Sequence, residues 1–294
     1  MRWSPGGRSR NLEDQRGAAP GGGGFRGGGF GGGGGRRMGL GGLLVLVILS
    51  VVLKKDLVSG LGGMGGELPG APSATATGAP APVQDASEEQ MVQFMSNVLD
   101  SAQTTWGRQL EGYQDAKLVL FRDAVGSACG YADAATGPFY CPGDQKVYID
   151  LAFFDQLDRQ FGAPGDFAQA YVLAHEIGHH VQNLMGTERK LRAAQQQNPG
   201  MKNKLSVAME LQADCYAGVW AYSAARNGQL ERGDLEEGLS AASAVGDDRL
   251  QKMGSGRVNP ESFTHGSSAE RMQWFKRGLE GGDPRQCDTF ASLR

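Results

Sequence analysis

Apolar residues recur at helical spacing in a stretch that marks where folded structure is predicted to begin. Beyond Ser87, the apolar positions follow one helix face: Met91, Phe94, Met95, Val98 and Leu99. Ser87 and Gln90 have the spacing of a capping box, which satisfies free amides at the start of a helix. We therefore predict an amphipathic helix packed on a domain that starts at Ser87.

The pattern then changes from short strands to longer helices. Residues 117–122 and 146–150 are rich in β-branched and aromatic side chains, as strands are. Helical patterns follow, at about residues 151–157, 165–185, 203–225, 230–253 and 268–279. Strands that precede helices predict a single α+β domain over residues 87–294, predominantly helical and with a small β-sheet.

The first third of the chain lacks these patterns. Residues 21–35 are nearly all glycine, and such sequence cannot bury enough apolar surface to offset its chain entropy. We therefore predict that residues 1–37 form a disordered tail rich in glycine and arginine. Residues 54–86, rich in Gly, Pro, Ala, Ser and Thr, predict a flexible linker.

Residues 38–53 lie between the tail and the linker and carry no charge. A helix of this length spans about 24 Å, which is a little short for a hydrocarbon core of about 30 Å. Lys54 and Lys55 could extend to the far interface. A secretory signal peptide is the alternative, but the preceding basic region is unusually long and no A-x-A cleavage site follows directly. We predict a single transmembrane helix.

Flanking charge predicts the orientation of that helix. Seven arginines precede residues 38–53, whereas only Lys54 and Lys55 follow them closely. The positive-inside rule then keeps the N-terminus in the cytoplasm. We accordingly expect a single-pass protein of the cell membrane with its catalytic domain in the periplasm or outside the cell.

The chain has four cysteines, Cys129, Cys141, Cys215 and Cys287, and no CxxC motif. Four cysteines allow three pairings. Cys129 and Cys141 flank a segment rich in turn-forming residues and could bridge it, which would leave Cys215 to pair with Cys287. Alternatively, some of the four remain buried free thiols.

Three of the four histidines fall within residues 175–180 and form an H-E-x-x-H motif. His175 and His179 are four residues apart, so both can point at one ion from the same face of a helix. Glu176 is one step round the helix, where it can reach a metal-bound water. The metal would acidify that water and the carboxylate would accept its proton. The alternative is a pair of buried histidines with hydrogen-bond partners and no metal.

A catalytic zinc site needs a third protein ligand and one open position. Glu210 and Asp214 lie four residues apart on a predicted helix that is largely apolar all round. An acidic pair on a buried helix predicts a bound cation. We expect Glu210 to bind the metal and Asp214 to hydrogen-bond a ligand histidine, which fixes its tautomer. The alternative is a solvated acidic face.

The remaining histidines have other predicted roles. His180 points about 100° away from His179 on an α-helix, so we interpret it as structural or supporting. His265 lies in a Gly/Ser-rich loop before the helix that carries Arg271. Hydrolysis of this type needs donors at the developing oxyanion, and His265 and Arg271 are candidates. The alternative is a loop histidine and a solvated or structural arginine.

Four separated motifs resemble one known family. The segments HEIGHHVQ, at residues 175–182, and ELQADCYAG, at 210–218, resemble the bacterial neutral zinc metallopeptidases, the YpfJ-like family. ATGPFYCPGDQKVYIDLAFF, at 135–154, and HGSSAERMQWF, at 265–275, are similar to the same family. More distantly, H-E-x-x-H with a later E-x-x-x-D is similar to the gluzincin pattern. The resemblance covers roughly residues 87–294.

This resemblance implies a zincin-like metallopeptidase domain that holds Zn²⁺. His175, His179 and Glu210 match zinc ligands and Glu176 matches the general base. Asp214 matches an acid that hydrogen-bonds a zinc-ligand histidine. The remaining two candidates, His265 and Arg271, match residues that contact substrate or the transition state.

We therefore predict a membrane-anchored zinc endopeptidase that acts on a peptide or protein, with the strand at residues 147–149 offering its edge to an extended substrate. One alternative is a non-catalytic membrane-anchored adaptor with a structural metal site. Another is a binding protein that uses the tail on RNA or anionic lipid. The formal net charge of −3 gives no general reason to expect a nucleic acid partner, and none is expected.

Overall fold

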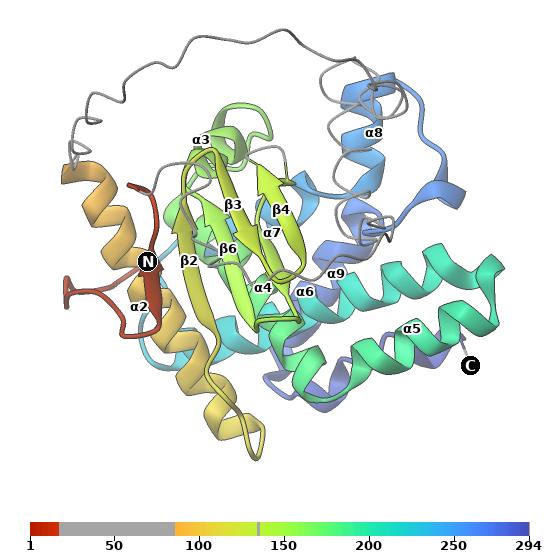
Figure 1. Cartoon of the computed structure of the whole chain (residues 1–294), viewed down its shortest axis with the longest axis horizontal. Helices are drawn as coiled ribbons and strands as arrows, with labels where there is room; N and C mark the ends of the chain where they lie inside the picture. The colour runs from red at the N-terminus through yellow and green to blue at the C-terminus, as the bar shows by residue number, and fades with distance from the viewer. Residues whose placement is uncertain (18–85, 134–135, 294) are drawn as a thin grey trace, which may run out of the picture.

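The computed structural model describes residues 1–17, 86–133 and 136–293, in which the strands and one long helix come first and the other helices follow (Figure 1). Four strands form a sheet in the order β1 (Leu12–Asp14), β2 (Lys117–Phe121), β6 (Lys146–Asp150) and β5 (Phe139–Cys141). The pairings β1–β2 and β2–β6 are parallel, whereas β5 runs antiparallel to β6. A separate hairpin comprises β3 (Ala124–Ser127) and β4 (Gly130–Asp133).

The helices outnumber the strands, so the predicted predominantly helical α+β class is confirmed for the described residues. They are α2 (Ala86–Gln109), α3 (Ala152–Arg159), α4 (Asp166–Leu184), α5 (Thr187–Gln197), α6 (Lys202–Arg226), α7 (Asp234–Ala244), α8 (Asp247–Ser255) and α9 (Ser268–Gly281). Short 3-10 turns lie at Pro199–Met201, Pro260–Ser262, Pro284–Gln286 and Ala291–Leu293.

Two helices differ from the sequence-based prediction. The helix predicted over residues 230–253 is two helices, α7 and α8, which are separated at Gly246. That glycine lies against the backbone of Ser268, so close that a Cβ would overlap it. Helix α5 was not predicted because it has no apolar face and buries none of its residues.

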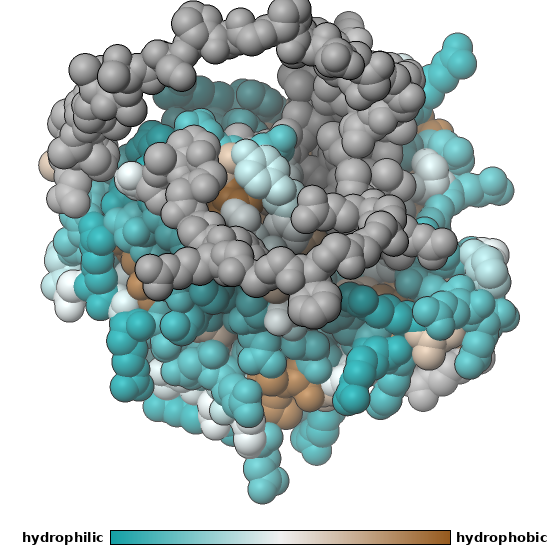
Figure 2. All heavy atoms as spheres, viewed as in Figure 1, coloured by the Kyte–Doolittle hydropathy of each residue, from teal (hydrophilic) through white to brown (hydrophobic). Residues whose placement is uncertain are grey.

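The sheet is buried on both faces. Alternate residues of β2 and β6 contribute to the main core with α2 and α4, among them Leu118, Leu120, Val147 and Ile149. The opposite face packs under the β3–β4 hairpin through Val119, Phe121 and Tyr148. Where its atoms are not grey, the face of the molecule in Figure 2 is mostly hydrophilic with small apolar patches.

Helices α6 and α9 cross with their backbones in direct contact. Gly278 of α9 faces the carbonyl of Cys215, and Gly218 of α6 faces the carbonyl of Phe275, with no room for a Cβ at either glycine. This close approach brings the last turns of α9 beside the middle of α6.

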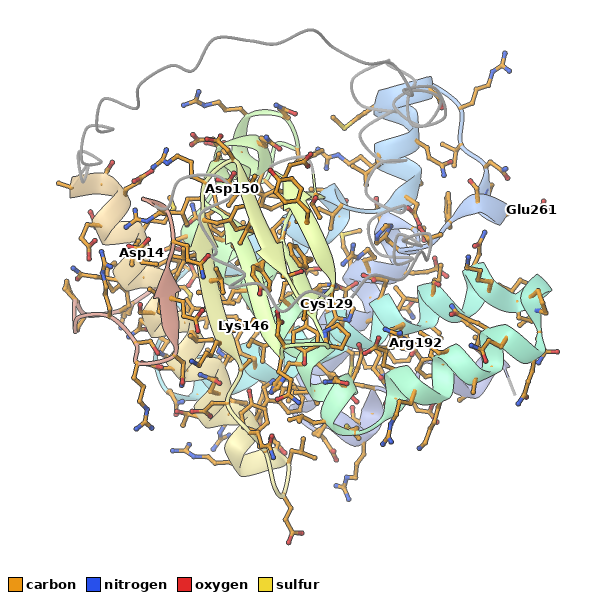
Figure 3. All side chains as sticks on the ribbon, viewed as in Figure 1. Asp14, Cys129, Lys146, Asp150, Arg192 and Glu261 are labelled. Carbon is orange, nitrogen blue, oxygen red and sulfur yellow. A yellow bond between two sulfur atoms is a disulfide. The ribbon has the colours of Figure 1, made fainter. Side chains whose placement is uncertain are left out.

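Both predicted disulfides are present. Cys129 lies at the turn of the β3–β4 hairpin (Figure 3) and bonds to Cys141 of β5. Cys215 of α6 bonds to Cys287, after α9, and thereby closes a loop across the helix crossing. No cysteine is left free.

The N-terminal residues depart most from the prediction. Residues 1–17, predicted to be disordered, dock on the domain through strand β1 and through specific anchors. Trp3 contacts Phe94 with ring centroids 5.6 Å apart, and Glu13 accepts a 2.7 Å hydrogen bond from Lys146. These apolar and ionic contacts offset the entropy of ordering the segment. The rest of the predicted tail, residues 18–37, lies outside the described residues.

The predicted transmembrane helix at 38–53 and the linker up to residue 85 also lie outside the described residues. Among the helices that are described, none is long and apolar enough to cross a membrane. The expected arrangement, with the N-terminus in the cytoplasm and the domain outside, depends on the helix predicted at 38–53 and stays a prediction.

Candidate metal centre

Helices α4 and α6 pack closely and bring two histidines of one against a carboxylate of the other. Gly178, within the H-E-x-x-H motif, makes this possible because a Cβ there would lie 3.0 Å from the carbonyl oxygen of Ala213. His175 and His179 thus face Glu210 across the helix contact. The ligand atoms of these three residues all lie within 4.8 Å of one another.

The separations suit a tetrahedral ion. His175 Nε2 lies 3.2 Å from Glu210 Oε2, and His179 Nε2 lies 3.7 Å from Glu210 Oε1. Ligand atoms at about 2.1 Å from a tetrahedral zinc are about 3.4 Å from each other. Two imidazoles and one carboxylate are also a donor set that zinc accepts in catalytic sites. The residues therefore fit a zinc ion.

Each histidine has its other ring nitrogen held by an acceptor. His175 Nδ1 lies 2.8 Å from Asp214 Oδ1, and His179 Nδ1 lies 2.8 Å from Gln182 Oε1. A proton on each Nδ1 satisfies these acceptors and leaves the Nε2 lone pairs directed at Glu210. The Gln182 amide is fixed in turn, since its nitrogen donates to the Met209 carbonyl at 2.7 Å.

Sequence reasoning missed Gln182. The signal was available, because a polar residue three positions after His179 shares its helix face. Gln182 is completely buried. Its oxygen supports His179 as Asp214 supports His175.

Replacing Gln182 by Met is expected to weaken zinc binding about 10–100-fold. Methionine keeps the volume but removes the acceptor at Nδ1, so the ring loses its fixed tautomer. The dissociation constant, measured by competition with a chelator, checks this. Gln196→Met, at an exposed position of α5, is the matched control, and equal affinity in both variants would contradict the supporting role.

Asp214 is the centre of a buried network. Arg271 donates to both of its oxygens, from Nε to Oδ2 at 2.7 Å and from Nη2 to Oδ1 at 2.9 Å. Tyr171 also donates its hydroxyl to Asp214. Burial alone would raise the pKa of Asp214, but Arg271 and His175 lower it below its usual value. Asp214 is thereby held as a carboxylate behind His175.

The expectation that Arg271 contacts substrate does not fit its position. Its side chain is only 4 % exposed, and a third donor, Nη1, reaches the Val245 carbonyl at 3.2 Å. All three nitrogens therefore have partners within the protein. Arg271 positions Asp214 and is not free to bind a substrate group.

Glu176 lies beside the three candidate ligands and is largely buried. Burial raises its pKa above the ordinary value, although His179 and His175 oppose that rise. A carboxylate with a raised pKa is a stronger proton acceptor. The environment therefore suits a general base.

His265 is held by an acid that sequence reasoning did not single out. Its Nδ1 lies 3.1 Å from Asp247 Oδ1. The other carboxylate oxygen of Asp247 accepts the backbone amides of Thr264, His265 and Gly266 at 2.6–3.0 Å. His265 is close enough to Glu210 to help lower its pKa. Nothing in the sequence pattern connects Asp247, at the start of α8, with the loop that carries His265.

His180 faces away from the candidate ligands. Its Nε2 donates to the Gln114 carbonyl at 2.6 Å, and its Nδ1 accepts from the Tyr140 hydroxyl at 3.0 Å. Both ring nitrogens therefore have partners outside the candidate metal site. The structural or supporting interpretation of His180 agrees with this placement.

The strand expected to offer its edge to substrate is not at an edge. Residues 147–149 belong to β6, which lies between β2 and β5. Strand β5 is the outer neighbour, and its Tyr140 accepts a 3.0 Å hydrogen bond from Asn183 of α4. The edge-strand expectation for residues 147–149 is therefore wrong.

A second group of acids among the described residues could also hold an ion: Asp166, Asp234 and Glu237. The N-terminal ammonium of Met1 already lies against it, 2.8 Å from Asp166 and 3.3 Å from Asp234. This ammonium offsets part of the negative charge of the group.

Comparisons with known proteins agree with the site. A sequence model of the family described as "Putative neutral zinc metallopeptidase" matches residues 1–290, docked N-terminal segment included. The YpfJ protein of Escherichia coli K12 is 46 % identical, with 99 % of each chain covered. Protein Mb2605 of Mycobacterium bovis is 48 % identical over 66 % of this chain and 68 % of its own. No solved structure matches. The chain belongs to the neutral zinc metallopeptidase family, of which YpfJ is a member.

Proposed function

We propose that the protein is a zinc-dependent endopeptidase that hydrolyses peptide bonds in peptide or protein substrates. The observation that carries the proposal is the convergence of His175 Nε2, His179 Nε2 and the Glu210 carboxylate at separations that suit one tetrahedral ion. Glu176, a buried carboxylate, lies beside them. Three ligands leave a fourth position for water or substrate.

The residues divide the chemistry between them. When bound, zinc supplies a Lewis acid that polarises the scissile carbonyl and acidifies water. Glu176 accepts the proton of the attacking water and delivers it to the leaving amine. When both of its ring nitrogens carry a proton, His265, held at Nδ1 by Asp247, donates a hydrogen bond from Nε2 to the developing oxyanion. Asp214 and Gln182 keep both ligand imidazoles in the binding tautomer.

The non-catalytic adaptor is less well supported. A structural zinc site is closed by four protein ligands. Within the described ranges, the group at the centre contains three, and His180 has both nitrogens engaged by Tyr140 and Gln114. No other histidine or cysteine of those ranges belongs to the group.

Metal content and proteolysis test the proposal together. The purified full chain is expected to hold one zinc per molecule and to cleave an unfolded protein such as reduced, alkylated casein. Treatment with a chelator should abolish cleavage, and added zinc should restore it. A chain that binds no divalent metal, or that cleaves equally well after metal removal, would overturn the proposal.

Substitution of His265 by Ala is expected to lower kcat about 10²–10³-fold. The loss should fall on kcat with little change in KM, because the hydrogen bond forms in the transition state. Steady-state kinetics on a fluorogenic peptide, with zinc content measured in parallel, checks this. A change in KM alone would assign His265 to substrate binding.

We also propose that the enzyme works in an oxidising compartment. Both disulfides, Cys129–Cys141 and Cys215–Cys287, support this, since such bonds persist outside the reducing cytosol. Attachment to the membrane through residues 38–53 stays a prediction. Proteolytic accessibility in intact spheroplasts, compared with lysed cells, tests the compartment.

A further inference from the structure

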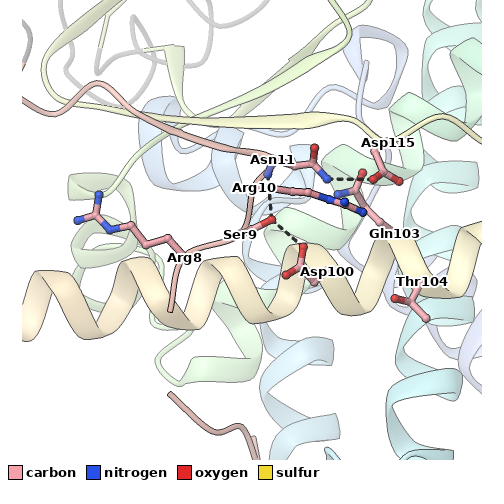
Figure 4. Close-up of a pocket in the computed structure, with 8 residues that line it drawn as sticks. All are labelled: Arg8, Ser9, Arg10, Asn11, Asp100, Gln103, Thr104 and Asp115. Atoms are coloured by element: carbon pink, nitrogen blue, oxygen red, sulfur yellow. Dashed lines mark hydrogen bonds between the residues drawn. The ribbon is translucent and has the colours of Figure 1, made fainter. Parts of the chain in front are cut away.

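A polar cavity of about 510 Å³ lies between the docked N-terminal segment and helix α2 (Figure 4). None of its lining residues belongs to the candidate metal centre. Its volume falls in the range of about 300–1,000 Å³ usual for small-molecule sites. Arg10 borders it from the N-terminal segment, Asp100 and Gln103 from α2, and Asp115 from the loop after α2.

Gln103 is the reason to expect a ligand there. Its side chain points from α2 toward Arg10 and Asp115 (Figure 4) and is only 5 % exposed. Neither its amide oxygen nor its amide nitrogen has a hydrogen-bond partner among the described residues. A buried amide without partners destabilises the folded chain, so a group that satisfies it is favoured. That group must supply one donor and one acceptor.

The charged side chains around the Gln103 amide can form further hydrogen bonds. Arg8 is engaged by Glu89 and Asp14. Arg10 has no hydrogen-bond or ion-pair partner among the described residues, so its guanidinium is available to a ligand. Asp100 accepts the Ser9 hydroxyl at 2.6 Å through one oxygen. Each carboxylate oxygen has two lone pairs, so Asp100 can accept more.

Asp115 can also accept further hydrogen bonds. It accepts the Asn11 amide at 2.9 Å through Oδ2. Counting partners among the described residues alone, the cavity therefore presents a guanidinium and an amide without hydrogen bonds and two partly used carboxylates.

We propose that this cavity binds short peptides with free amino and carboxyl termini. A peptide bond offers the N–H and C=O that Gln103 lacks. The terminal carboxylate matches Arg10, which binds such groups through two parallel hydrogen bonds. The terminal ammonium matches Asp100 or Asp115. This site is separate from the metal centre and does not depend on the proposed peptidase activity.

The test uses L-alanyl-L-alanine as the probe, with the full chain carrying Glu176→Gln so that the dipeptide is not hydrolysed. The melting temperature is expected to rise saturably with dipeptide concentration. N-acetyl-L-alanine amide has the peptide group but neither charge, and should bind about tenfold or more weakly. No saturable rise up to about 10 mM dipeptide, the range of very weak binding, would overturn the proposal.

Two variants locate the binding. Gln103→Met, added to the same chain, removes the amide at similar volume and should abolish the dipeptide shift. Its melting temperature without ligand should not fall, because an unsatisfied buried amide is removed. Unchanged dipeptide binding in Gln103→Met would place the probe elsewhere and overturn the proposal.

Arg10→Met should weaken the dipeptide about tenfold and leave the uncharged probe unaffected. Arg2→Met is its control, since Arg2 lies on the same segment but pairs with Glu231. Equal weakening in both arginine variants would contradict the role of Arg10.

Discussion

The Glu176→Gln variant is expected to lose about 10²–10⁴-fold in kcat and to keep its zinc. Glutamine has the shape of glutamate but cannot accept a proton at neutral pH. The three candidate ligands and their supports are untouched, so metal affinity should change little. A thousandfold loss corresponds to about 4 kcal/mol of transition-state stabilisation. Peptide cleavage rates and zinc content of the same preparation provide the measurement.

A matched control separates this effect from a general change of charge. Glu236→Gln makes the same substitution on the exposed face of α7 and should leave both kcat and zinc content unchanged. If Glu176→Gln cleaved peptides at the wild-type rate, Glu176 would not be the base. Loss of zinc together with activity would instead assign it to metal binding.

Gly278→Ala is expected to lower the free energy of unfolding by about 3 kcal/mol. The added methyl group would overlap the backbone carbonyl of Cys215, which cannot rotate away as a side chain could. Helices α6 and α9 would have to separate. Arg271 of α9 would then move from Asp214 of α6, so zinc affinity should fall as well.

Denaturant unfolding of the oxidised protein measures this effect. Gly107→Ala is the control, because Gly107 lies inside α2 and an added methyl group there would meet nothing within 4 Å. That substitution should stabilise the protein by about 0.5–1 kcal/mol through helix propensity. Equal stability of the two variants would show that the helix crossing tolerates a methyl group.

The chemistry of the centre could be predicted because it is periodic. Four-residue spacing places His175 beside His179, and Glu210 beside Asp214, on any helix. The helices themselves follow from long apolar patterns, and the amphipathic helix after Ser87 follows from its apolar face. These are local properties, which a single sequence contains.

What could not be predicted depends on contacts between distant segments. Arg271 has the residue type of an oxyanion donor, and only the crossing of α6 and α9 commits it to Asp214. Asp247 reaches His265 because Gly246 breaks a helix that the apolar pattern extends. The docking of residues 1–17 rests on a few anchors, such as Trp3 and Glu13, within sequence whose composition predicts disorder.

Strand β1 has a consequence for how the protein behaves at high concentration. It occupies the side of β2 that would otherwise present unpaired amides and carbonyls next to the apolar residues Leu118 and Leu120. Open strands of this kind recruit neighbouring molecules and seed aggregates. The N-terminal segment therefore protects the chain from self-association, and a shortened chain that begins after residue 17 would be prone to aggregate even if the three candidate metal ligands were intact.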